Sequence, residues 1–112
     1  MIKENKIGII GLGYVGLPLA LSFANKFMVV GYDKSLKRIN ELNLGMDANN
    51  EFTKLEIKKS KRIKFSNDKQ LLSECNFFII TVPTPITRNK KPEKLFGLVM
   101  FENWRRAYNI SL

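Results

Sequence analysis

Three glycines lie close together near the amino end of the chain, Gly11, Gly13 and Gly16, within the stretch KIGIIGLGYVGLPLA (6–20). They follow a short apolar run that is typical of a buried parallel strand, and they precede a stretch whose apolar residues have helical spacing. At such a junction the first glycine permits a sharp turn, the second lets a ligand approach the backbone, and the third lets the helix pack closely. The same pattern also occurs in plain strand-to-helix turns, so the neighbouring residues decide its meaning.

The residues that follow favour a dinucleotide. The helix expected from Tyr14 and Val15 presents its unpaired N–H groups and the positive end of its dipole at the glycine turn, which suits a diphosphate. Asp33 comes 22 positions after Gly11, at the end of a second strand-like run. A carboxylate there accepts hydrogen bonds from the hydroxyls of an adenosine ribose and repels a 2′-phosphate. The pattern therefore predicts an NAD site, and the alternative for Asp33 is an N-cap or turn residue before the next helix.

Two further positions bear on this site. Lys34 and Arg38 complicate the cofactor choice, because a cation near the ribose accommodates a 2′-phosphate. Arg38 is expected either to reach a ribose hydroxyl or to be a surface cation. Thr84, in TVPTP (81–85), follows the clearest strand-like run and offers a hydroxyl and a backbone amide beside the dinucleotide, unless the prolines there simply terminate a strand. Asp33 decides the choice for NAD.

Strand-like and helical stretches alternate along the chain. The strand-like runs are 7–10, 27–33, 62–65 and 76–85, and the helical ones are 15–24, 35–45, 52–61 and 68–75. This alternation predicts an α/β fold, a partial Rossmann-like doubly wound parallel sheet of about four strands in the order 3-2-1-4 with helical crossovers. The ligand is expected at the carboxyl ends of the strands, between strands one and four. No fifth strand is expected, so the fourth strand has an open edge that favours self-association.

Composition excludes several classes of site and partner. A chain of 112 residues fits one small domain, and no stretch approaches the ~18 apolar residues of a membrane span. The start of the chain does not resemble a signal peptide, so we expect a cytoplasmic protein. It has no histidine and one cysteine, Cys75, which leaves no internal disulfide, no Cys/His metal site and no imidazole-activated nucleophile. The net charge of +9 favours anionic partners, but the lysine-rich stretches lack aromatic residues that stack bases, so no nucleic acid is expected.

The stretches IGIIGLGYVGLPLA, GYDKSLKRINELNLG and FFIITVPTP, in this order and spacing, resemble the N-terminal domain of the UDP-glucose/GDP-mannose dehydrogenase family. NLGMDANNE and VPTPITRNKKP are most similar to the branch that acts on UDP-N-acetyl-hexosamines, such as UDP-N-acetylglucosamine 6-dehydrogenases. The resemblance implies that Tyr14 and Val15 belong to the pyrophosphate loop, that Asp33 and Arg38 contact the adenosine ribose, and that Thr84 contacts the cofactor.

The resemblance also implies chemistry that this chain does not carry. Enzymes of the family oxidise the C6 alcohol of the sugar to a carboxylate in two steps, with two NAD⁺ and a cysteine that holds a thioester. That cysteine, the catalytic lysine and the sugar-nucleotide domain are expected beyond this chain, and Cys75 is not the nucleophile. We therefore expect no catalytic residue here, and a UDP-sugar partner only for the intact enzyme.

The resemblance covers roughly residues 5–92, so we expect 1–92 to be the N-terminal part of the NAD-binding domain and 93–112 to be a tail unlike the family. We expect a disrupted reading frame near Pro92, which comparison of the coding DNA in all three frames tests. The alternative is a divergent C-terminal helix that covers the sheet. For function, the first hypothesis is an NAD-binding fragment of a nucleotide-sugar 6-dehydrogenase, inactive alone. The alternatives are a stand-alone dinucleotide-binding or regulatory module and, as the weakest, a nucleic-acid-binding chain.

Overall fold

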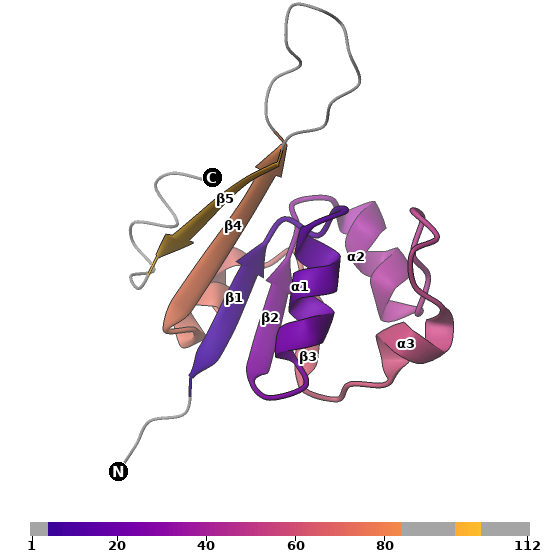
Figure 1. Cartoon of the computed structure of the whole chain (residues 1–112), viewed down its shortest axis with the longest axis horizontal. Helices are drawn as coiled ribbons and strands as arrows, with labels where there is room; N and C mark the ends of the chain where they lie inside the picture. Colours follow the sequence, from indigo (N-terminus) through magenta and orange to yellow (C-terminus); the bar gives the residue numbers. More distant parts are fainter. Residues whose placement is uncertain (1–4, 84–95, 102–112) are drawn as a thin grey trace, which may run out of the picture.

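The computed structural model of the chain describes residues 5–83 and 96–101 (Figure 1). Strands and helices alternate through most of it, as the hydrophobic pattern predicts. The elements in chain order are β1 (Lys6–Ile10), α1 (Gly16–Phe23), β2 (Met28–Tyr32), α2 (Leu36–Asn43), α3 (Lys54–Lys58), β3 (Ile63–Ser66), the 3₁₀ helix η1 (Lys69–Glu74), β4 (Phe77–Pro83) and β5 (Phe96–Phe101). No helix in this described part is long and apolar enough to cross a membrane.

The strands form one sheet in the order β3-β2-β1-β4-β5. The first four are parallel, with Ile9 of β1 opposite Gly31 of β2 on one side and opposite Ile79 of β4 on the other. This confirms the predicted order 3-2-1-4 and the helical crossovers. It also brings the carboxyl ends of β1, β2 and β4 to one edge of the sheet, where doubly wound sheets bind ligands.

The fifth strand corrects the sequence analysis. β5 runs antiparallel to β4, with Thr81 opposite Leu98 and Phe78 opposite Phe101 (Figure 1). The expectation that the chain holds no fifth strand was wrong, and the alternative of a C-terminal helix is wrong for the described stretch 96–101. The edge of β4 expected to stay open is paired, because unsatisfied backbone groups of an apolar strand gain hydrogen bonds from any compatible segment. The edge on which self-association was expected is therefore paired within the chain, and self-association itself stays a prediction.

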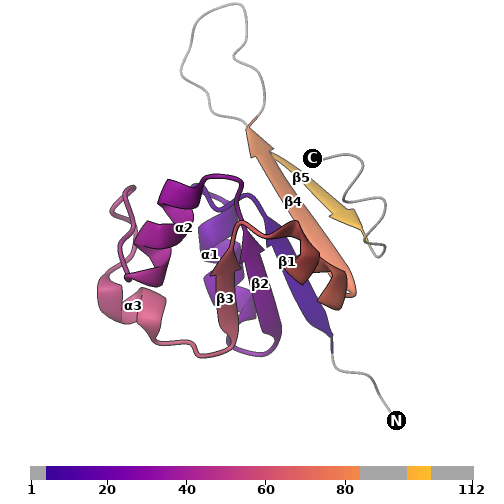
Figure 2. The same cartoon turned by 180° about the vertical axis from the view of Figure 1, so that it is seen from behind.

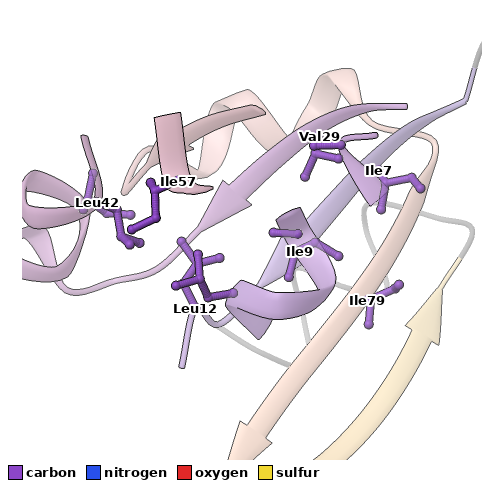
Figure 3. Close-up of a cluster of buried hydrophobic side chains, with 11 residues drawn as sticks. Ile7, Ile9, Leu12, Val29, Leu42, Ile57 and Ile79 are labelled. Carbon is purple, nitrogen blue, oxygen red and sulfur yellow. The ribbon is translucent and has the colours of Figure 1, made fainter. Parts of the chain in front are cut away.

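Helices cover both faces of the sheet. α1 packs against β1 and β2 on the face turned to the viewer in Figure 1, and η1 lies on the opposite face, which is turned to the viewer in Figure 2. One buried cluster joins the sheet to α1, α2 and α3, and Figure 3 labels its members Ile7, Ile9, Leu12, Val29, Leu42, Ile57 and Ile79. The cluster beneath η1 consists of Ile10, Val30, Tyr32, Leu72, Cys75, Phe78 and Ile80. The glycine turn thus rests on a sheet that is packed from two sides.

Local signals set where the helices begin. The Ser35 hydroxyl caps α2 by accepting the N–H of Arg38, as the sequence predicts. Thr53 caps α3 through a capping box with Glu56, which provides acceptors for two otherwise unpaired N–H groups at the start of that helix. Gly45 has φ +78°, a left-handed conformation that ends α2 and turns the chain toward α3. These features hold α2 in place beside the carboxyl end of β2.

Candidate nucleotide-binding site

The glycine turn between β1 and α1 is packed too closely for any side chain at two of its three glycines. Gly11 has φ +97°, and a Cβ there would lie 2.4 Å from the carbonyl oxygen of Thr81. A Cβ at Gly16 would lie 1.6 Å from the carbonyl oxygen of Gly11. The N–H of Gly11 donates to the carbonyl of Tyr32 at 2.8 Å, which ties the turn to the end of β2. Gly11 and Gly16 are therefore required by the fold itself.

Gly13 differs from these two glycines. A Cβ at Gly13 would meet no atom within 4 Å, and its φ lies outside the left-handed region. The backbone of this residue is exposed, so packing within the described chain gives no reason for a glycine here. Open space beside a bare backbone is what close approach by a ligand requires.

The start of α1 has no cap from its own sequence. Val15 occupies the N-cap position and makes no side-chain cap hydrogen bond, whereas Ser35 and Thr53 cap α2 and α3. The N–H of Leu17 donates to the carbonyl of Gly13 at 3.2 Å, so the helical hydrogen bonds begin at the glycine turn. The first turn of a helix carries N–H groups without helical acceptors, and an anion is a suitable partner for them.

Tyr14 and Val15 stand where the sequence analysis places them, between the second and third glycines. The Tyr14 side chain is 44% exposed, and Val15 is half-buried. Pro18 falls in the first turn of α1, where the loss of a backbone N–H is best tolerated. The turn thus exposes its backbone and one aromatic side chain at the carboxyl edge of the sheet.

Asp33 follows β2 directly and reaches across to the glycine turn. Its Oδ2 accepts the N–H of Leu12 at 2.9 Å, and its Oδ1 accepts the N–H of Ser35 at 2.9 Å. The second of these bonds is the turn role weighed as the alternative for this residue. Each carboxylate oxygen has a second lone pair, so both retain the capacity to accept a ligand hydroxyl.

Arg38 lies on α2 and is not the surface cation considered as its alternative. Its side chain is only 12% exposed. Its Nε donates to the carbonyl of Leu12 at 2.8 Å, and its Nη1 donates to Asp47 Oδ1 at 2.8 Å. The remaining nitrogen, Nη2, is buried without an acceptor among the described residues.

Asp47 was missed by the sequence analysis. It lies in the loop after α2, its side chain is 1% exposed, and its carboxylate also accepts the N–H groups of Asn49, Glu51 and Phe52 at 2.9–3.2 Å. Burial by itself raises the pKa of Asp47, but the hydrogen bond and charge of Arg38 and the backbone N–H groups together hold the pKa below the usual value of an aspartate. An acidic residue followed by asparagines was the available signal, because such residues close loops through their side chains.

Thr81 was also missed. Its buried hydroxyl donates to the carbonyl of Gly11 at 2.9 Å and lies where a Cβ on Gly16 would be 2.9 Å away. It therefore ties β4 to the first glycine of the turn and lies close to the third. The sequence analysis selected Thr84 instead, which lies outside the described residues.

Cys75 sits at the far side of the sheet from these residues, in the cluster beneath η1. Its thiol is free and buried. Burial, with a smaller contribution from the charge of Glu74, raises the pKa of its thiol to about 11. The thiol is consequently protonated at neutral pH, which agrees with a packing role rather than a nucleophilic one.

Comparison with known proteins places these features in a family. The model of the UDP-glucose/GDP-mannose dehydrogenase family, NAD binding domain, matches residues 5–99. UDP-N-acetyl-D-glucosamine 6-dehydrogenase of Salmonella typhi is 52% identical over 92 residues, and the protein of that name from Pseudomonas aeruginosa is 46% identical over 92 residues. Among solved structures, UDP-D-ManNAc dehydrogenase from Pyrococcus horikoshii superposes with a TM-score of 0.62 at 33% identity, over 73% of this chain and 21% of that one. The resemblance inferred from the sequence is confirmed, and NAD is confirmed as the cofactor of this domain.

The aligned region covers most of this chain but only a small part of each relative. Each of the two curated relatives is aligned with 82% of this chain, and the chain spans 22% of their length. The matched region of the family contains every described residue of the glycine turn, together with Asp33, Arg38 and Thr81. The chain belongs to the UDP-glucose/GDP-mannose dehydrogenase family and carries its NAD binding domain.

Proposed function

We propose that this chain binds the adenosine diphosphate part of NAD⁺ as the cofactor-binding portion of a UDP-N-acetyl-hexosamine 6-dehydrogenase. The observation that carries the proposal is the Asp33 carboxylate, which lies at the end of β2 and accepts the N–H of Leu12 inside the glycine turn. One residue further on, Gly13 has open space beside its backbone, and α1 begins at Gly16 without a side-chain cap. An acceptor for ribose hydroxyls therefore adjoins a set of N–H donors for a diphosphate.

Each residue of the site has a role in this proposal. The backbone from Gly11 to Gly16, including Tyr14 and Val15, holds the diphosphate, and Asp33 accepts from the ribose hydroxyls. The buried Nη2 of Arg38, which has no acceptor among the described residues, gains one from a ribose oxygen. Thr84 is proposed to contact the same cofactor from the end of β4. When bound, NAD⁺ supplies hydride acceptance, and the protein groups here only bind and orient it.

Charge balance supports NAD⁺ over NADP⁺. Arg38, one of the two cations that the sequence analysis names as able to accommodate a 2′-phosphate, is paired with Asp47 at 2.8 Å. Its charge is therefore largely neutralised within the protein. Among the described residues the Asp33 carboxylate accepts backbone N–H groups and makes no ion pair, so no cationic side chain there offsets its repulsion of a 2′-phosphate.

The oxidation of the sugar is proposed for the intact dehydrogenase and not for this polypeptide alone. The relatives named UDP-N-acetyl-D-glucosamine 6-dehydrogenase support the UDP-N-acetyl-hexosamine class as the substrate. The only cysteine, Cys75, has a pKa of about 11 and lies in the core, so it does not supply a thiolate for covalent chemistry. We accordingly expect cofactor binding without turnover.

A stand-alone dinucleotide-binding module is the second candidate, and the pairing of β5 with β4 favours it. A chain that closes the edge of β4 with its own strand has less need of a further segment to fold. Cooperative unfolding of the isolated chain, with a midpoint that NAD⁺ raises, supports the module. Non-cooperative unfolding supports the first candidate, in which the chain folds only as part of the longer enzyme.

The test of NAD⁺ binding is calorimetric titration of the purified chain with NAD⁺ and NADP⁺. We expect NAD⁺ to bind at least about tenfold more tightly, because Asp33 repels a 2′-phosphate. In Asp33→Asn, which keeps an acceptor oxygen and removes the charge, this preference should fall below about twofold. Asp68→Asn is the matched control, since Asp68 also accepts a backbone N–H two residues ahead, at 2.9 Å, but caps η1. No binding of either nucleotide, or an unchanged preference in Asp33→Asn, contradicts the proposal.

A further inference from the structure

Leu12, the residue between the first two glycines, is held at both of its peptide groups. Its N–H donates to Asp33 Oδ2 at 2.9 Å, and its carbonyl accepts from Arg38 Nε at 2.8 Å. Its side chain is fully buried in the cluster that joins the sheet to the helices (Figure 3). The path of the backbone into Gly13 is therefore set by two side chains, one from the end of β2 and one from α2.

Arg38 can hold the Leu12 carbonyl only if its own guanidinium is fixed. The guanidinium is planar, so the direction of Nε–H is determined once Nη1 is bound. Nη1 donates to Asp47 Oδ1 at 2.8 Å, and the Asp47 carboxylate is in turn held by N–H groups of the loop that follows it. Hydrogen bonds therefore run without a break from the backbone of the 47–52 loop through Asp47 and Arg38 to the carbonyl of Leu12 in the glycine turn.

We propose that Asp47 is a positioning residue of the dinucleotide site, which acts through Arg38 to fix the glycine turn in the conformation that receives the diphosphate. The inference rests on the proposed function. Without the Asp47 charge, the buried Arg38 loses its counter-ion, and its long side chain gains from turning toward solvent. The Leu12 carbonyl then loses its donor, and the turn at Gly13 becomes free to adopt other conformations.

The alternative is that Asp47 only stabilises the loop in which it lies. Three of its four hydrogen bonds go to the backbone of Asn49, Glu51 and Phe52, so the residue also stabilises that loop. A loop role alone predicts lower stability on substitution, with no change at the glycine turn. The two roles are separable because only one of them passes through Arg38.

The first measurement is residue-resolved amide hydrogen exchange of the nucleotide-free chain. In Asp47→Asn we expect exchange at Leu12 and Gly13 to rise about tenfold relative to the strand amide of Ile9. Arg38→Met, which keeps Asp47 and its loop bonds, should raise exchange at Leu12 and Gly13 without raising it at Glu51. Because Arg38→Met tests the same link, the proposal remains decidable if Asp47→Asn does not fold. Unchanged exchange at Leu12 and Gly13 in Arg38→Met overturns it.

The second measurement is a double-mutant cycle on NAD⁺ affinity. Asp47→Asn should weaken NAD⁺ about fivefold or more in the wild-type background and less than about 1.5-fold in the Arg38→Met background, because the two residues act as a unit. The loss of thermal stability that Asp47→Asn causes through its own loop should be present in both backgrounds. An equal weakening in both backgrounds overturns the inference.

Ser60→Ala is the control for general loosening. The Ser60 hydroxyl donates to the carbonyl of Ala24 at 3.3 Å and accepts the N–H of Arg62 at 3.2 Å, so it also anchors a loop that is remote from the glycine turn. Its substitution should lower stability and leave both NAD⁺ affinity and exchange at Leu12 unchanged. If wild type does not bind NAD⁺, the proposed function fails, whereas the exchange experiment still decides the role of Asp47.

Discussion

Alanine at Gly13 and alanine at Gly16 should have opposite effects on folding and on nucleotide binding. At Gly16 the new Cβ would lie 1.6 Å from the Gly11 carbonyl oxygen, whereas ordinary contact begins at 3.4 Å. α1 must therefore move away from the sheet, which for overpacking costs about 3 kcal/mol. In a domain of this size such a loss lowers Tm by about 12–24 °C.

At Gly13 the new Cβ meets no atom within 4 Å, and the backbone does not adopt a left-handed φ. The folded state should accept alanine there, and the smaller entropy of the unfolded chain should stabilise it by about 0.4–1 kcal/mol. The same methyl group occupies the space through which the diphosphate approaches the backbone. We expect NAD⁺ affinity to fall at least about tenfold in this otherwise stable variant.

The assay is a thermal melt of wild type, Gly13→Ala and Gly16→Ala with and without NAD⁺ at about 100 times the wild-type Kd. Ligand at that excess adds about 2.7 kcal/mol to wild type, and a tenfold weaker Kd leaves about 1.4 kcal/mol. The corresponding rises in Tm are about 11–22 °C and 6–11 °C. A wild-type NAD⁺ shift in Gly13→Ala would refute the assignment of Gly13 to the diphosphate. A wild-type Tm in Gly16→Ala would refute the packing argument.

The structure predicts four further outcomes. Thr81→Val removes the buried hydroxyl that donates to the Gly11 carbonyl at 2.9 Å, and chemical denaturation should show a loss of about 1–3 kcal/mol, while Ser73→Ala, at an exposed hydroxyl, should cost less than about 0.5 kcal/mol. Because the pKa of Asp47 is lowered by its partners, its contribution to stability is present above pH 3.8 and is lost as pH falls below that value. Asp47→Asn should therefore lose less stability than wild type as the pH is lowered through this range. An equal loss in the two proteins would contradict the role given to the Asp47 carboxylate. Because the pKa of Cys75 is raised from 9.0 to about 11, its contribution is complete below pH 9 and is lost as pH rises toward 11, so wild type should lose more stability across this interval than Cys75→Ala. The same thiol should react with a disulfide reagent at about pH 8 only after unfolding, and rapid reaction of the folded chain would contradict its burial.

The order of the parallel strands and the main residues at the turn could be predicted from sequence because each depends on local pattern. Gly11 and Gly16 are recognisable by spacing, and the structure explains them by a left-handed φ and by a 1.6 Å approach to a carbonyl. Ser35 was recognisable as an N-cap, because its partner is only three residues away. Such features are short-range and carry their own signal.

The residues that sequence reasoning missed make contacts between distant segments. Thr81 donates to Gly11, 70 positions earlier, and nothing in the strand-like run 76–85 marks that hydroxyl as different from its neighbours. Asp47 gains its significance from Arg38, which is itself fixed by a carbonyl 26 positions earlier. β5 was missed because a short apolar run with a glycine has no decisive period, and only the free edge of β4 makes it a strand.

The central claim is that the carboxyl edge around the glycine turn binds NAD⁺, and a titration of the ¹⁵N-labelled chain with NAD⁺, followed by amide chemical shifts, tests it most directly. The account predicts that the largest shifts map to Leu12–Gly16 and to Asp33–Arg38, while Lys6 and Asn76, which are bonded at the amino end of β1, remain unchanged. Absence of shifts at saturating NAD⁺, or shifts confined to the amino end of the sheet, would contradict the account.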